Sequence, residues 1–372
     1  MHNTSLAPGE FKTLNATHTE TVEIFDLGTK LGMSFPYIPL MIISLIGNSL
    51  VCYVIQRYLQ NSVTNIFLFN LSITDILTTL AVIPMTAIAD IWLNHWPFGA
   101  AMCKLVPFIQ CITVTLTAFT HVLISCDRFL IVFRPLQRRR LLTPRRARFL
   151  IILLWVTACI QATPLAVVGY LPEGPNARCA ESWDAHRSQA YTTTLMVMQY
   201  FIPLTLLICS YSVICWKLNS TQGRGPVSAS RSRMTVRSKR KVSRPLRLLL
   251  AVVEAFCAII IIVIIAITSS TTATSKGELM VKMMIAVSAL YAVSQLPRHV
   301  IYLYGTVVNW ASKDLAIAWM FVVLLSSSAS CYNPFIYAWM NQTYRIGFTR
   351  GNSRCSGMAN VGPSRLGATV PD

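Results

Sequence analysis

Charged side chains stand at a few fixed places inside long apolar runs of this sequence. Asp75 is an acid within the run 64–91, and Asp127 and Arg128 form an adjacent acid–base pair near the end of the run 104–133. A charge in a membrane costs free energy unless it has a partner, so such residues are functional candidates by default. The chemistry they offer is ion pairing and hydrogen bonding. The runs hold no cluster of metal ligands and no nucleophile beside a base, which argues against an enzyme.

The composition indicates a protein that crosses the membrane several times. Of its 372 residues, 54% are hydrophobic and 12% are charged, whereas about 25% of a soluble protein is charged. The net charge is +18, which in a soluble chain would suggest a nucleic-acid partner. Here the basic residues gather between apolar runs. The excess of Lys and Arg in cytosolic loops explains this pattern, so no nucleic acid is expected.

Several apolar runs are long enough to cross a bilayer, because a spanning helix needs about 20 residues. They are 36–57, 64–91, 104–133, 149–171, 191–216, 246–268, 279–305 and 315–340. The segments 134–148 and 218–245 are strongly basic, whereas 92–102, 171–190 and 306–314 are close to neutral. Basic loops face the cytosol, so we expect an extracellular N-terminus.

The run 246–268 conflicts with that topology. An eighth span would put the C-terminal tail outside the cell, yet this tail carries Arg345, Arg350 and Arg354. We therefore expect seven spans and a non-spanning insertion at 246–268. This would be either a helix that extends from the membrane or a translated non-coding segment. A true span with altered topology is the alternative.

The expected organisation is an all-α membrane protein in three parts. Residues 1–35 would form a glycosylated extracellular segment, 36–340 a seven-helix transmembrane domain, and 341–372 a cytoplasmic end. Asn3 and Asn15 begin glycosylation sequons in the first part.

Two kinds of cysteine have expected roles. Cys103 and Cys179 fall at outer positions, where an oxidising exterior favours a disulfide between them. Cys355 follows the short amphipathic stretch 341–350 among basic residues. It is a candidate for palmitoylation, and a free thiol is the alternative.

Motifs in the apolar runs resemble those of rhodopsin-like (class A) G-protein-coupled receptors. In chain order they are Gly47-Asn48, Leu71-Ser-Ile-Thr-Asp75, Cys103, Asp127-Arg128-Phe129, Trp155, Pro164, Pro203, Tyr211 and Asn333-Pro334-Phe335-Ile336-Tyr337. Each motif is weak alone, but their joint order over nearly the whole chain is specific. The resemblance implies a seven-helix bundle with a short amphipathic eighth helix, in the plasma membrane. It also implies a heterotrimeric G protein as the cytosolic partner.

Within that family the chain is similar above all to receptors of the neuropeptide Y and F type. Trp96-Pro-Phe-Gly, Met102 to Cys111 and Ser330 to Tyr337 carry the likeness. It implies a secreted, C-terminally amidated neuropeptide as the ligand. Receptors for RYamide-like, tachykinin-like and FF-like peptides share much of the pattern and are alternatives. A peptide-binding receptor that does not signal and a transporter are further alternatives.

The resemblance places the ligand in the outer half of the bundle. Gln110 matches a glutamine that receives the peptide's terminal amide, and its side chain offers both a donor and an acceptor. Thr86 matches a second contact, and Gln295, His299 and Tyr302 complete the expected site. An interhelical hydrogen bond is the alternative role for Gln110, and packing for His299 and Tyr302. Gln295 stands where the family has tryptophan, which casts doubt on the usual activation trigger.

Asp75 matches the aspartate that holds a sodium ion in this family. Asn48, Thr117, Ser330 and Asn333 would complete a network of polar groups and water around the ion. The alternative is a protonated Asp75 in a structural hydrogen-bond network.

A last set of residues resembles the family's activation switch. Arg128 would leave Asp127 on activation and form the floor of the G-protein cavity. Tyr211 and Tyr337 resemble tyrosines that move inward. Asn333-Pro334 would supply a kink, because proline removes a helical hydrogen bond.

Overall fold

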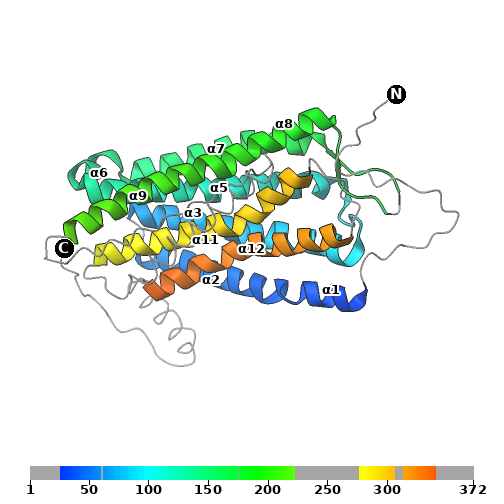
Figure 1. Ribbon diagram of the computed structural model, residues 1–372, viewed down its shortest axis with the longest axis horizontal. Coiled ribbons are helices and arrows are strands. Elements are labelled where there is room, and N and C mark those ends of the chain that lie inside the picture. Colours follow the sequence, from blue (N-terminus) through cyan, green and yellow to red (C-terminus); the bar gives the residue numbers. More distant parts are fainter. Residues whose placement is uncertain (1–25, 60–61, 175, 223–275, 306–312, 341–372) are drawn as a thin grey trace, which may run out of the picture.

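The computed structural model describes residues 26–59, 62–174, 176–222, 276–305 and 313–340. Over these residues seven helical segments run side by side along the long axis of the molecule (Figure 1). They are α1–α2 (Leu27–Ser34, Tyr37–Tyr58), α3–η1–α4–η2 (Val63–Leu77, Thr78–Val82, Ile83–Ala87, Ile88–Leu93), α5 (Gly99–Phe133), α7 (Pro144–Val168), α8–η3–α9 (Ala185–Met196, Val197–Phe201, Ile202–Gln222), α11 (Lys276–Gly305) and α12 (Lys313–Met340). The predicted seven-helix bundle is confirmed.

Length and composition allow six helical runs of the described residues to cross a membrane: Leu27–Tyr58, Val63–Leu93, Gly99–Phe133, Pro144–Val168, Ala185–Ile214 and Ile317–Tyr337. The outward face of α7 is apolar, with Phe149, Ile152, Ile160 and Val167 each at least 61% exposed. Only 11% of the apolar window of α7 is buried inside the bundle. In water such a surface would be costly, whereas lipid tails would cover it.

Local sequence signals set the ends of several helices. Asp184 accepts a hydrogen bond from the backbone N–H of Arg187 at 2.9 Å and so caps α8. Backbone donation to this exposed carboxylate holds the pKa of Asp184 below its usual range. At the other end of a helix, α5 stops at Phe133 because the residue before Pro135 is disfavoured in the α region.

Prolines also explain two π-helical turns that the sequence pattern did not predict. The turn η1 ends at Val82, two residues before Pro84, and η3 ends at Phe201, two residues before Pro203. Proline lacks an N–H and disturbs the ladder of the preceding turn, and wider π turns accommodate such defects. These segments therefore bend where they pass the interior of the bundle.

Close packing joins the first and last helices. A Cβ on Gly47 would lie 2.8 Å from both Cβ and Cγ of Pro334, so α2 and α12 approach too closely for any larger residue. Trp155 on α7 donates its indole N–H to Asn70 Oδ1 at 2.8 Å, and Asn70 donates to Thr120 at 2.9 Å. These bonds fix α3 and α7 to α5.

Short elements connect the helices at the two ends of the bundle. The strands β1 (Gly169–Tyr170) and β2 (Ala180–Glu181) pair antiparallel, with Gly169 opposite Glu181. The predicted disulfide is present, since Cys179 beside β2 is bonded to Cys103 on α5 with a Cα separation of 5.5 Å. We call this the disulfide end. At the opposite end lies α6 (Pro135–Leu141), a short helix within the basic segment 134–148 (Figure 1).

The predicted N-terminal boundary differs from the structure, and several predicted segments lie outside the described residues. The first helical segment begins at Leu27, inside the range 1–35 expected to form the extracellular N-terminus. The predicted insertion 246–268 and the amphipathic stretch 341–350 lie outside the described residues, as do Asn3, Asn15 and Cys355.

Candidate functional site

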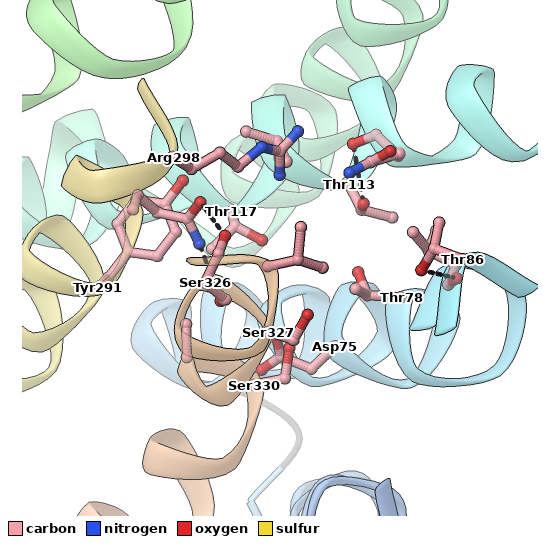
Figure 2. Close-up of a pocket in the computed structure, with 16 residues that line it drawn as sticks. Asp75, Thr78, Thr86, Thr113, Thr117, Tyr291, Arg298, Ser326, Ser327 and Ser330 are labelled. Atoms are coloured by element: carbon pink, nitrogen blue, oxygen red, sulfur yellow. Dashed lines mark hydrogen bonds between the residues drawn. The ribbon is translucent and has the colours of Figure 1, made fainter. Parts of the chain in front are cut away.

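A cavity of about 60 Å³ opens inside the bundle between α3–η1–α4, α5, α11 and α12. One water molecule needs roughly 10–15 Å³ on this scale, so the space holds a few waters or a small polar group. Figure 2 shows polar side chains from these helices around the cavity. Several predicted ligand and sodium residues line it together: Asp75, Thr86, Gln110, Thr117, Gln295 and Ser330.

Asp75 forms the inner end of the cavity. Asn333 on α12 donates its amide N–H to Asp75 Oδ2 at 2.7 Å, and the Ser330 side chain is also hydrogen-bonded to this carboxyl. Asn48 donates to the backbone oxygen of Ser330 at 2.8 Å, while its own Oδ1 is buried without a hydrogen-bond partner. Thr117 lines the same cavity from α5, whereas Asn48 is not among the lining residues. Carboxylate and hydroxyl oxygens are donors that hard cations prefer.

Gln110 and Thr86 line the part of the cavity nearer the disulfide end. Gln110 is half-buried on α5, about two helical turns from Cys103 along the helix. The Thr86 hydroxyl donates to the backbone oxygens of Val82 at 2.9 Å and Ile83 at 3.1 Å. Thr86 is therefore held by its own helix, and its oxygen lone pair remains available as an acceptor.

Gln295 explains why both sets of residues share one cavity. Ser326 Oγ donates to Gln295 Oε1 at 2.6 Å, and Gln295 Nε2 donates to the Ser326 backbone oxygen at 3.2 Å. These bonds hold the amide against α12. A glutamine is also smaller than the tryptophan that the family resemblance leads one to expect. The space between Asp75 and Gln110 is consequently open.

The sequence reasoning missed Arg298, which lines the cavity from α11. Figure 2 shows its guanidinium well apart from Asp75. The signal was in the sequence, because Arg298 is the one Arg or Lys in the apolar stretch 285–301, and a charge in such a stretch is a functional candidate.

The two other predicted ligand residues on α11 are His299 and Tyr302. His299 is 8% exposed, and its ring centroid lies 4.6 Å from that of Tyr200. It is absent from the cavity lining, so its position agrees with the packing role. Tyr302 belongs to α11, but its side chain lies outside the described part of the structure.

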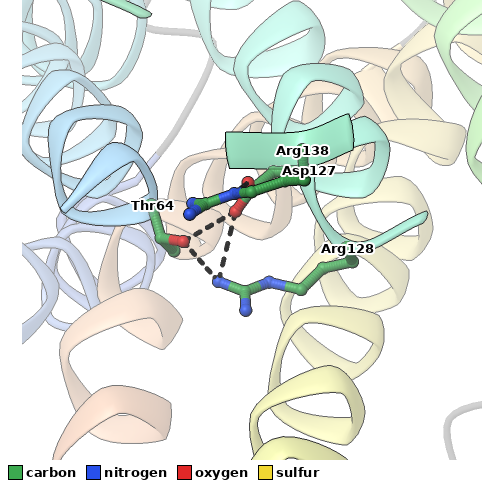
Figure 3. Close-up of polar contacts among 4 residues, drawn as sticks. All are labelled: Thr64, Asp127, Arg128 and Arg138. Atoms are coloured by element: carbon green, nitrogen blue, oxygen red, sulfur yellow. Dashed lines mark hydrogen bonds and ion pairs between the residues drawn. The ribbon is translucent and has the colours of Figure 1, made fainter. Parts of the chain in front are cut away.

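A compact charge cluster lies at the α6 end of the bundle (Figure 3). We call Thr64, Asp127, Arg128 and Arg138 the Asp127 cluster. Thr64 Oγ1 donates to Asp127 Oδ2 at 2.7 Å and accepts from Arg128 Nη2 at 2.7 Å. Arg138 Nε donates to Asp127 Oδ1 at 2.9 Å, whereas Arg128 Nη2 lies 3.7 Å from Asp127 Oδ2. Asp127 and Arg128 are almost fully buried.

The cluster departs from the simple pair that the sequence predicted. Asp127 and Arg128 are paired as expected, but the shorter ion pair is that of Asp127 with Arg138 on α6. Arg138 was one of seven arginines in the segment 134–148, and nothing in the sequence set it apart. Only the fold of α6 shows which arginine faces the carboxylate.

The predicted switch residues Tyr211 and Tyr337 are both buried. The Tyr211 hydroxyl is 3.2 Å from Ser288 Oγ on α11, which in turn is 3.3 Å from His121 Nδ1 on α5. This hydrogen-bonded chain joins α9, α11 and α5 between the cavity and the Asp127 cluster. Sequence reasoning did not single out His121 or Ser288.

Comparison with known proteins assigns the chain to a family. The family model for the 7 transmembrane receptor (rhodopsin family) matches residues 47–337. The chain belongs to the rhodopsin family of seven-transmembrane receptors. This receptor is therefore a multi-pass plasma-membrane protein and not an enzyme.

Individual relatives of the receptor are named as peptide receptors. It is 31% identical to the RYamide receptor of Drosophila melanogaster over 87% of this chain and 63% of that protein. It is 28% identical to the RYamide receptor of Tribolium castaneum, over 84% of this chain and 78% of that one. It is 26% identical to neuropeptide FF receptor 2 of Rattus norvegicus, over 84% and 70%. The receptor thus spans somewhat less than two thirds of the length of the Drosophila protein.

Proposed function

We propose that the chain is a receptor for a secreted, C-terminally amidated peptide and that it activates a heterotrimeric G protein. The observation that carries the proposal is the polar cavity that Gln110 and Thr86 line within the bundle of a rhodopsin-family receptor. The named relatives recognise RYamide and neuropeptide FF. They favour a peptide of the RYamide or FF kind over the neuropeptide Y/F kind that the motifs first suggested.

In this proposal the peptide enters from the disulfide end, which faces the cell exterior, and its terminal amide meets Gln110. The amide of Gln110 both donates and accepts, and so does a terminal carboxamide, so the two groups can form a reciprocal pair. Thr86 supplies a further acceptor. Such neutral hydrogen bonds contribute about 0.5–1.5 kcal/mol each, so they give preference and not the bulk of the affinity.

The direct test compares a synthetic peptide ending in Arg-Tyr-amide with its free-acid form on membranes that carry the full receptor. We expect Gln110→Ala to weaken binding of the amide about tenfold. Gln137→Ala on α6, at the other end of the bundle, is the matched control and should bind like the wild type. If Gln110→Ala leaves the affinity for the amide unchanged, Gln110 does not receive the peptide terminus.

The Asp127 cluster supplies the proposed cytosolic site. Arg128 is held by Thr64 and Asp127, so releasing it would expose a charged donor at the α6 end. Ligand binding would favour the released arrangement only by its differential affinity for the two states. Tyr211, Tyr337 and the Asn333-Pro334 pair lie on the helices that would change position.

Asp75 supports a second proposed ligand, a sodium ion. Its carboxylate and the Ser330 and Thr117 hydroxyls, which line the same cavity, would offer oxygen donors to such an ion. The ion would add a positive charge to a buried carboxylate and so reduce its cost in the membrane. Sodium should raise the unfolding temperature of the purified receptor relative to choline at equal ionic strength, and Asp75→Asn should lose the effect.

One observation favours a receptor that binds without signalling. Gln295 replaces the expected tryptophan and is fixed to Ser326 by two hydrogen bonds, so the usual trigger is missing. Peptide-stimulated nucleotide exchange on a purified G protein separates the two functions. Binding without exchange, in the presence of every major G-protein class, would establish the non-signalling function.

A further inference from the structure

Arg298 places a permanent positive charge in the wall of the cavity, and the function proposed above makes no use of it. It follows Pro297 within α11 and lines the cavity together with Gln110 and Gln295 (Figure 2). A guanidinium in a membrane-spanning helix is costly unless it faces a polar interior. The polar cavity therefore provides the environment that the guanidinium of Arg298 requires.

The electrostatic surroundings differ between the two ends of the cavity. At the inner end, Asp75 is held by Asn333 and Ser330. At the other end, Arg298 lines the cavity from α11 beside Gln110 and Gln295, and its guanidinium is always protonated. Arg298 thus brings a positive charge to the part of the cavity that Gln110 lines.

We propose that Arg298 is an anion-binding group and that the ligand presents a carboxylate to it. This inference rests on the proposed peptide function for the identity of the ligand. A guanidinium is planar and donates two parallel hydrogen bonds to a carboxylate, which a point charge cannot do. Gln110, in the same lining, donates a further bond. A carboxylate has few atoms, which suits a cavity of about 60 Å³.

A peptide has two sources of this carboxylate. It can be a free C-terminus, which would replace the terminal amide beside Gln110. It can also be an acidic side chain next to an amidated terminus, so that Gln110 and Arg298 bind neighbouring groups of one peptide. Both sources use the same chemistry at Arg298, and a set of matched peptides distinguishes them.

The first experiment needs no knowledge of the natural ligand. Acetate and acetamide have the same shape and differ in charge, so they are matched probes of the cavity. We expect acetate to raise the unfolding temperature of the purified full-length receptor more than acetamide or chloride does at the same concentration and ionic strength. Arg298→Gln should abolish the difference. Arg187→Gln, at an exposed arginine of α8, should retain it.

The second experiment uses peptides that share one sequence ending in Arg-Tyr. Three forms are compared: a peptide ending in Gln-Arg-Tyr with a free-acid terminus, the same peptide ending in Glu-Arg-Tyr-amide, and the neutral form ending in Gln-Arg-Tyr-amide. We expect one carboxylate-bearing form to bind the wild type at least about tenfold more tightly than the neutral form. Arg298→Gln should reduce that advantage to less than about threefold, and Arg298→Glu should reverse it.

The outcomes separate this inference from the peptide function. If acetate stabilises the wild type no more than acetamide, or if Arg298→Gln keeps the difference, the anion site is wrong even when peptides bind. If no peptide of the set binds but the acetate effect depends on Arg298, the anion site stands and the peptide function fails. If the neutral peptide binds as tightly as both charged forms, Arg298 does not select the ligand.

Discussion

The cavity and the Asp127 cluster both gather polar side chains inside an apolar bundle, but they do so in different ways. The cavity leaves about 60 Å³ between its side chains. In the Asp127 cluster the side chains contact one another directly, at 2.7–3.7 Å. The first arrangement leaves room for a group that the ligand supplies. In the second, Asp127 is already paired with two arginines, and these contacts have to be broken before the cluster can bind anything else.

The cavity and the Asp127 cluster should also differ in the free energy that a substitution costs. Removing one member of a buried charge cluster leaves the remaining charge without compensation, which costs about 3–5 kcal/mol. Changing a side chain that borders an open, polar cavity costs less, because water can take the place of the lost group. The end of the bundle that holds Asp127 should therefore be sensitive to substitution in stability, and the cavity in ligand affinity.

The largest expected effect comes from Asp127→Asn. The substitution removes the negative charge between Arg128 and Arg138, both of which point at it. We expect a loss of about 3–5 kcal/mol in the free energy of unfolding and a higher basal rate of nucleotide exchange, because Arg128 loses its ion pair with Asp127. Thermal unfolding of the purified receptor measures the first effect.

Asp184→Asn is the matched control for that substitution. Asp184 also lies close to an arginine, Arg187, at 3.1 Å, but both side chains are more than half exposed. Surface pairs contribute little because water screens them. The contrast between cluster and surface would be lost if Asp184→Asn destabilised the receptor as much as Asp127→Asn.

Gly47→Ala tests the close packing of α2 against α12, which holds both regions in place. The added Cβ would meet Pro334 at 2.8 Å, so α2 and α12 would have to separate near Asn48 and Asn333. Overpacking of this kind costs about 1–3 kcal/mol. Gly32→Ala on α1 is the control, since nothing lies within 4 Å of its Cβ. If both substitutions give equal unfolding temperatures, the close approach of α2 and α12 is not a constraint.

Ser288→Ala tests the chain between the two regions. It removes the hydroxyl that joins Tyr211 to His121, and the expected loss is about 1 kcal/mol in the free energy of unfolding. The double variant Ser288→Ala with Tyr211→Phe should cost less than the sum of the two single changes, because both remove the bond between Tyr211 and Ser288. Full additivity would show that the chain does not act as a unit.

The smallest effect on stability is expected for Thr86→Val in the cavity wall. The Thr86 hydroxyl bonds only to carbonyls of its own helix among the contacts described, and valine has the same shape. We expect the free energy of unfolding to change by less than about 0.5–1 kcal/mol, while affinity for an amidated peptide falls. A large loss of stability with unchanged affinity would place Thr86 in the framework and not in the ligand site.

The sequence was sufficient for the fold and for much of the cavity. Apolar runs and basic loops predicted the spans, and the outer positions of two cysteines predicted the Cys103–Cys179 disulfide. The family resemblance grouped Asp75 with Asn333. The π turns before Pro84 and Pro203 could not, because they depend on how a local defect is absorbed. The pairing of Arg138 with Asp127 could not be predicted either, because the seven arginines of the segment 134–148 look alike in the sequence. Only α6 places one of them beside Asp127.

We propose that the cavity receives the peptide and that the Asp127 cluster transmits its binding to a G protein. The direct measurement is nucleotide exchange on a heterotrimeric G protein, stimulated by the Arg-Tyr-amide peptide, with binding followed in parallel. Gln110→Ala should require about tenfold more peptide yet reach the wild-type maximum. Arg128→Ala should bind the peptide like the wild type and stimulate no exchange. If Arg128→Ala lost peptide affinity while Gln110→Ala lost only exchange, the two regions would have the opposite roles and the account would be wrong.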